Sequence, residues 1–127
     1  MSLQEIILCE QNKLVEIANL KFSLGIPGET TLSMLGMTDI KKSNDKWNEL
    51  YRGLFHTVKL FDDIKETLMA LKRGGFSLGV VTSKTEEELL YDFEHFSLMQ
   101  YFDCYICADD TIKHKPAPEP ILKYNVF

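Results

Sequence analysis

Roughly the first 55 residues carry apolar side chains at helical spacing and show no strand-like alternation. One helix is predicted over residues 3–22, and a loop with two glycines and a proline ends it. Its apolar positions are Leu3, Ile7, Leu14, Ile17 and Ala18. A short helix over 29–35 follows. A longer helix, capped by Thr38 or Asp39, then runs to about Phe55. Its predicted buried stripe is Ile40, Trp47, Leu50, Tyr51 and Leu54.

After His56 the pattern changes to helices that alternate with short apolar runs. A capping box at 63–66 predicts a helix that ends at a pair of glycines, and the apolar run 76–82 is typical of a parallel strand covered on both faces. A second capping box at 85–88 predicts another helix, and residues 103–107 predict a second strand. Strand, helix and strand in this order predict a parallel βαβ unit.

Two polar signals fall where these strands end, and parallel strands end at the same edge of a sheet. At the tip of the first strand, the Thr82 hydroxyl and the free backbone N–H groups of Ser83 and Lys84 form a candidate anion pocket. The second signal is the loop 113–118, where prolines stiffen the backbone and hold Lys115 in place. Taken singly, each signal has a plainer alternative: the threonine as an ordinary turn or cap residue, and the loop as an ordinary solvated loop.

Together, these two signals resemble the second and third signature motifs of haloacid dehalogenase-type hydrolases. Four segments are similar to the phosphoglycolate phosphatase and β-phosphoglucomutase branch of that superfamily. They are 62–68, 75–84, 96–103, and 108–110 with 115–120. The match covers roughly residues 61–124, and the stretch before it is similar to the helical cap of that branch. The resemblance implies an α/β fold, with a partial Rossmann-like core over 58–127 and an N-terminal α-helical cap domain over 1–57.

The resemblance also implies a chemistry, which is Mg²⁺-dependent hydrolysis of a phosphomonoester through an aspartyl-phosphate. Thr82 would then hydrogen-bond the transferring phosphoryl group, with the Ser83 N–H beside it. Lys115 would neutralise that group, so Thr82 and Lys115 are the expected catalytic residues and bind phosphate together with Ser83. Lys84 and Lys113 are expected to be solvated.

The sequence departs from the family in its acidic residues. It contains no Asp-x-Asp, which in the family supplies the nucleophile and the general acid/base, and the later acidic motif does not occur before Phe127. No metal ligands are therefore assigned in this chain, and we expect it to be catalytically incomplete, as a truncated domain or an incomplete record. A non-catalytic phosphate-binding module derived from the same fold is the alternative.

Charge and composition narrow the expected partners. The net charge of -5 and the lack of a long basic block argue against nucleic acid and anionic lipid. No apolar run is long enough to span a membrane, and the start lacks a secretory signal, so we expect a cytoplasmic protein. A small-molecule partner fits this charge better, and the resemblance implies that it is a phosphorylated metabolite. The identity of that metabolite and the oligomeric state stay open.

Cys104 and Cys107 form a C-x-x-C, which invites a redox or zinc interpretation. In a short strand, however, positions three apart point to opposite faces, and no second pair completes a zinc set. We therefore expect reduced, buried structural cysteines and rank the redox or zinc domain behind the two phosphate-binding hypotheses.

Overall fold

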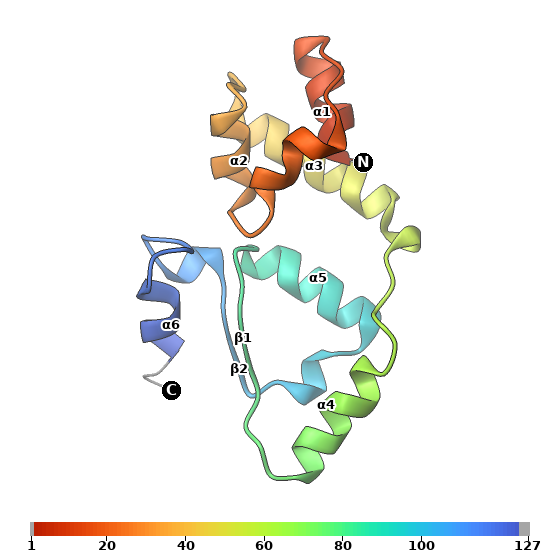
Figure 1. Ribbon diagram of the computed structural model, residues 1–127, viewed down its shortest axis with the longest axis vertical. Helices are drawn as coiled ribbons and strands as arrows, with labels where there is room; N and C mark the ends of the chain where they lie inside the picture. The colour runs from red at the N-terminus through yellow and green to blue at the C-terminus, as the bar shows by residue number, and fades with distance from the viewer. Residues whose placement is uncertain (1, 125–127) are drawn as a thin grey trace. The chain divides into compact units, whose positions relative to one another are not determined.

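The computed structural model describes residues 2–124, and it divides into two compact units, Met1–Lys59 and Leu60–Phe127 (Figure 1). The first unit is helical throughout its described residues. Its α-helices are α1 (Ser2–Gln11), α2 (Gly28–Met34) and α3 (Ile40–Gly53), and its 3-10 helices are η1 (Ile17–Ser23) and η2 (Phe55–Thr57). This agrees with the absence of strand-like alternation in that part of the sequence.

The first unit is built around an apolar core to which each of its α-helices contributes. The buried members are Leu3, Ile6, Ile7, Leu20, Leu32 and Met37. From the predicted stripe of α3, the side chains of Ile40, Trp47 and Leu50 pack against this core. Polar bonds add to the contact between α1 and α3, since Ser43 Oγ donates to Glu10 Oε2 over 2.6 Å and Trp47 Nε1 donates to Ser2 Oγ over 2.9 Å.

The single helix predicted over 3–22 is wrong, because α1 ends at Gln11 and Asn12 takes a left-handed φ of 51°. After the break, Leu14 is 86% exposed, although its spacing suggested a buried position. The chain then turns back, held in part by a 2.9 Å hydrogen bond from Gln4 Nε2 to the Val15 carbonyl, and η1 brings Leu20 into the core. The chain therefore loses helical hydrogen bonds after Gln11, and the return of the chain buries Leu20 in the core.

The next two predicted helices are present with shifts of one or two residues at their ends. Of the two predicted caps for α3, Asp39 is the N-cap, and its carboxylate accepts from the Lys42 N–H over 3.1 Å. Helix α3 ends at Gly53, so Phe55 lies in η2 and not in the helix.

The second unit contains a parallel βαβ arrangement, as predicted. Its helices are α4 (Ile64–Arg73), α5 (Glu86–Phe96), η3 (Met99–Tyr101), η4 (Ala108–Asp110) and α6 (Glu119–Tyr124), and its strands are β1 (Gly79–Val81) and β2 (Cys104–Ile106). The strands pair in parallel with Val80 opposite Tyr105. Figure 1 shows them side by side, with α4 and α5 on one side and α6 on the other.

Two details of the second unit differ from expectation. The first strand is only three residues long and is partly exposed, so it is not covered on both faces. The capping box predicted at 63–66 does not form, because Asp63 takes a left-handed φ of 61° and its side chain makes no capping bond. An N-cap residue needs an extended backbone to point its oxygen at the first turn. Thr85 has that backbone, and its capping box with Glu88 is complete, with bonds of 3.3 and 2.9 Å.

Among the described residues, no helix has the length and apolar character needed to cross a membrane.

Candidate phosphate-binding site

Thr82 directly follows β1 and continues its pairing, because its N–H donates to the Ile106 carbonyl over 2.9 Å. Its side-chain oxygen accepts from the Lys84 N–H over 3.1 Å. The predicted free N–H of Lys84 is therefore wrong, since the threonine itself uses that group. This bond fixes the hydroxyl oxygen as an acceptor, so its own hydrogen can be donated outward to an anion.

Two hydrogen bonds join the loop after β2 to the turn after β1. The Ala108 N–H donates to the Lys84 carbonyl over 2.8 Å, and the Glu86 N–H at the start of α5 donates to Asp109 Oδ2 over 2.7 Å. The two strand ends thus lie beside each other, as the parallel arrangement predicted. Asp109 is a residue whose role the sequence did not reveal, because its partner lies 23 positions away.

Lys115 reaches the end of β1 from the loop over residues 111–118. Its side chain is half-buried, and its Nζ donates to the Val81 carbonyl over 3.3 Å. Val81 immediately precedes Thr82, so the ammonium lies next to the residue that carries the hydroxyl. The structure therefore places the Lys115 ammonium at the backbone of the residue before Thr82, and Ser83 directly follows Thr82.

The pairing pattern shows on which edge of β1 this lysine lies. The Leu78 carbonyl and the Thr82 N–H face β2, since they bond Asp103 and Ile106. Backbone groups of alternate residues in a strand point to opposite edges. The Val81 carbonyl, and with it the ammonium of Lys115, therefore lies on the edge of β1 that faces away from β2.

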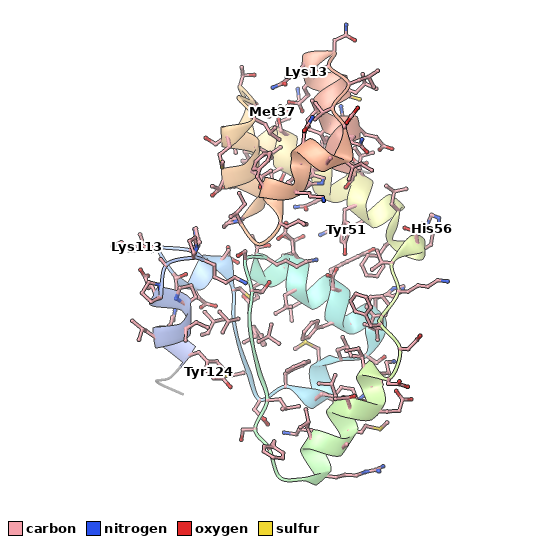
Figure 2. The ribbon with its side chains drawn as sticks, in the orientation of Figure 1. Lys13, Met37, Tyr51, His56, Lys113 and Tyr124 are labelled. Carbon is pink, nitrogen blue, oxygen red and sulfur yellow. The ribbon has the colours of Figure 1, made fainter. Side chains whose placement is uncertain are left out.

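The other two lysines near the site lie in different environments. Lys84 was expected to be solvated, and this is wrong, because its ammonium forms an ion pair with Asp92 of α5. The pair holds the Lys84 charge against α5. Lys113 is exposed, as expected, in the loop before α6 (Figure 2).

The aspartates of the loop after β2 are bound to other groups of the protein. The Cys107 N–H donates to Asp110 Oδ2 over 2.8 Å, and Lys123 Nζ donates to the Asp110 carbonyl oxygen over 2.6 Å. Lys123 Nζ also donates to the carboxylate Oδ1 of Asp110 over 3.3 Å. The backbone hydrogen bond from Cys107, and after it this side-chain bond from Lys123, lower the pKa of the Asp110 carboxyl. Asp110 is therefore an ionised structural link between η4 and α6.

The C-x-x-C does not have the character of a reactive site. Cys104 and Cys107 are both free thiols; Cys107 is buried as expected, whereas Cys104 is only partly buried, so that half of the prediction is wrong. Burial raises the pKa of the Cys107 thiol to about 11, so it is protonated at neutral pH, whereas the thiolate is the nucleophile and the metal ligand. Within residues 2–124, no group of three or more His, Cys, Asp or Glu side chains could hold a metal ion. The described residues therefore offer neither the ligand set of a structural zinc site nor a cluster of three carboxylates for Mg²⁺.

Comparison with known proteins gives the same family that the motifs suggested. A model of the family "Haloacid dehalogenase-like hydrolase" matches residues 2–125. Pyrophosphatase PpaX of Anoxybacillus flavithermus is 34% identical over 84 residues, which are 62% of this chain and 39% of that protein. A phosphoglycolate phosphatase of Nitrosospira multiformis is 36% identical over 69 residues, covering 54% of this chain and 30% of that protein. The chain thus spans less than half the length of these curated relatives.

Solved structures support the fold. A predicted phosphoglycolate phosphatase of Haemophilus somnus superposes with a TM-score of 0.76 at 18% identity, covering 96% of this chain and 60% of that chain. A subfamily IA hydrolase of the same superfamily from Geobacter sulfurreducens gives a TM-score of 0.67 at 23% identity, with 97% and 61% covered. The α/β fold with a partial Rossmann-like core is therefore confirmed.

Proposed function

The chain belongs to the haloacid dehalogenase-like hydrolase family, and we propose that it supplies the phosphate-binding part of a phosphomonoester hydrolase together with its helical cap. One observation carries this proposal: Lys115 Nζ lies 3.3 Å from the carbonyl oxygen of Val81, beside the hydroxyl-bearing Thr82. A fixed donor and a fixed cation at one strand tip are what a phosphoryl group requires.

In this proposal each group has a distinct role. The Thr82 hydroxyl, oriented by the Lys84 N–H, donates to one oxygen of the phosphoryl group, and the Ser83 N–H donates to another. Lys115 neutralises the charge that spreads over the equatorial oxygens as the group is transferred. None of these groups forms or breaks a covalent bond, so they bind and stabilise while other residues perform the chemistry.

The nucleophile would come from residues outside this sequence. The proposal requires an Asp-x-Asp strand upstream and a later acidic motif downstream, which would supply the carboxylates for the aspartyl-phosphate and for Mg²⁺. On the edge of β1 that faces away from β2, the backbone groups of Gly79 and the N–H of Val81 would face such a strand, while the Val81 carbonyl already accepts from Lys115. Pairing there would bring its last residues next to Lys115.

The substrate in this proposal is a small phosphorylated metabolite. The net charge of -5 disfavours nucleic acid. Pyrophosphate, phosphoglycolate, a sugar phosphate and a nucleotide would all engage Thr82 and Lys115 in the same way, so the cap over residues 1–57 would choose among them and exclude water. A cytoplasmic location stays part of the proposal.

The test is the activity of the source protein. We expect its intact mass to exceed that of this chain, and we expect it to hydrolyse an aryl phosphate in the presence of Mg²⁺. Lys115→Met should lower kcat/KM by on the order of 10²–10³, which is the effect of removing one electrostatic stabiliser of a transition state. Lys113→Met, with the same charge change in the same loop, should leave kcat/KM within about a factor of two, as expected for an exposed charge. A source protein with no Asp-x-Asp strand before Leu3 would overturn the proposal.

A non-catalytic phosphate-binding module is the second candidate, favoured by the absence of Asp-x-Asp from the sequence. It uses the same Thr82 and Lys115 pocket. It predicts that inorganic phosphate raises the melting temperature of this chain, while aryl phosphate is not hydrolysed by the source protein in Mg²⁺. The hydrolysis assay therefore separates the two candidates.

A further inference from the structure

Glu119 makes a pair of contacts that reach outside its own helix. It is the first residue of α6, and its Oε1 accepts from the Ile112 N–H over 2.9 Å while its Oε2 accepts from the Lys113 N–H over 3.2 Å. Each carboxylate oxygen thus binds one of two consecutive backbone N–H groups. Hydrogen bonds to an ionised acceptor are stronger than those between neutral groups.

These bonds join the beginning of the loop that carries Lys115 to its end. The residues between the clamped amides and Glu119 are His114, Lys115 and the proline-rich stretch 116–118, and the Ala117 N–H bonds the His114 carbonyl inside the loop over 2.9 Å. The carboxylate therefore closes a short loop of backbone that runs from Ile112 to Glu119, and Lys115 is in the middle of this segment. The direction in which the Lys115 side chain leaves the loop depends on the shape of this segment.

An ordinary role as a helix cap does not account for these contacts. A capping carboxylate accepts from N–H groups of its own first helical turn. Both partners of Glu119 instead lie six and seven positions earlier in the chain.

We infer that Glu119 is a positioning residue, whose carboxylate holds the loop in the shape that places the Lys115 ammonium beside Thr82. This inference rests on the proposed function, in which Lys115 meets the bound phosphoryl group. Glu119 itself does not touch the anion, and it acts only through the backbone of Ile112 and Lys113. Loss of the clamp lets Lys115 sample other positions, so phosphate binds more weakly although both Thr82 and Lys115 are still present.

The experiment uses this chain with inorganic phosphate as the probe and measures Kd by titration calorimetry. Glu119→Gln keeps the size of the side chain but presents an NH₂ group to one of the two N–H donors. It should weaken phosphate binding about tenfold, the effect of losing one hydrogen bond to a charged group. Glu66→Gln makes the same charge change at an exposed position on α4 and should leave Kd unchanged. Thermal unfolding of both variants checks that they remain folded.

The same substitution made in the Lys115→Met variant shows whether Glu119 affects phosphate binding through Lys115 or independently of it. In Lys115→Met, the added substitution Glu119→Gln should have no further effect on Kd, because its route to the anion has been removed. An equal loss in both backgrounds, or no loss in the first, overturns the inference about Glu119. If Lys115→Met itself leaves phosphate binding unchanged, the proposed function fails instead.

A readout that needs no phosphate tests the inference in either case. The ¹⁵N ammonium resonance of Lys115, followed by NMR in the absence of phosphate, should shift and broaden in Glu119→Gln and stay in place in Glu66→Gln. A Lys115 resonance unchanged by Glu119→Gln would contradict the positioning role, whatever the phosphate titration shows.

Discussion

The two units of the chain are organised by different interactions. In the first, side chains from α1, η1 and α2 bury one another in a single apolar core. In the second, the residues around the candidate site are held by carboxylates on backbone N–H groups, as in Asp109 with Glu86 and Glu119 with Ile112. Apolar burial is non-directional, whereas hydrogen bonds fix distances and angles. The second kind of construction is therefore suited to placing a threonine and a lysine around one anion.

The largest predicted change in the free energy of unfolding comes from a substitution in the apolar core of the first unit. Ile6 is completely buried there, and Ile6→Ala should lower the free energy of unfolding by about 2–5 kcal/mol, because it removes buried methyl groups and leaves a cavity. Leu14→Ala removes a comparable side chain that is 86% exposed, and it should change the stability by less than about 0.5 kcal/mol. Urea denaturation measures both. Equal losses would show that Leu14 is buried after all.

A substitution at the contact between α6 and β1 should cause the next largest loss of stability. A Cβ added at Gly79 would overlap the ring of Tyr124, which Figure 2 shows reaching toward the strands. Gly79→Ala should therefore cost about 1–3 kcal/mol, as overpacked substitutions do. In a Tyr124→Ala background the same change should be nearly neutral, as denaturation can show. A cost that persists without the tyrosine would place the strain in the strand itself.

A smaller effect separates two capping sequences that look alike. Thr85→Ala should lower the stability by about 1 kcal/mol, since the Thr85 side chain accepts from the Glu88 N–H. Asp63→Asn should change it by less than about 0.5 kcal/mol, because Asp63 makes no capping bond and asparagine also tolerates a left-handed backbone. Thermal unfolding of the two variants provides the measurement. A large loss in Asp63→Asn would mean that its carboxylate has a partner after all.

The smallest effect concerns the dependence of stability on pH. The bonds from Cys107 and Lys123 lower the pKa of Asp110 in the folded protein, so its ionised form stabilises the fold. This contribution is complete above the pKa of the unfolded chain and is lost as the pH falls through the lowered folded pKa. Asp110→Asn should therefore be less stable than the unsubstituted chain at pH 7, and the difference should shrink below about pH 4. A difference independent of pH would show that the charge of Asp110 does not matter.

The sequence was informative where structure is decided locally. The box at Thr85 formed as predicted because its partners lie three residues apart, and the parallel strand pair predicted from the apolar runs is present. The similar pattern at 63–66 did not form a capping box, because the Asp63 backbone adopts a left-handed conformation that residue spacing does not reveal. The helix over 3–22 failed for a related reason, since the return of Leu20 to the core outweighs continued helix after Gln11.

The hydrogen bonds from backbone N–H groups to carboxylates around the candidate site could not be predicted in this way. Asp109 and Glu119 bind backbone N–H groups, and every residue except proline offers such a group, so no residue type marks the partner. The pair of Lys84 with Asp92 likewise depends on how α5 leaves the turn after β1. These contacts depend on how the chain folds around the two strand ends, which local sequence patterns do not reveal.

The most direct test of the central claim is an NMR titration of this chain with inorganic phosphate. If Thr82 and Lys115 hold one phosphoryl group, the amide signals of Thr82 and Ser83 and the ammonium signal of Lys115 will shift together and follow a single Kd. Thr82→Val and Lys115→Met will each weaken that binding. Saturation that leaves the Lys115 signal unmoved, or shifts confined to another part of the chain, would contradict the account.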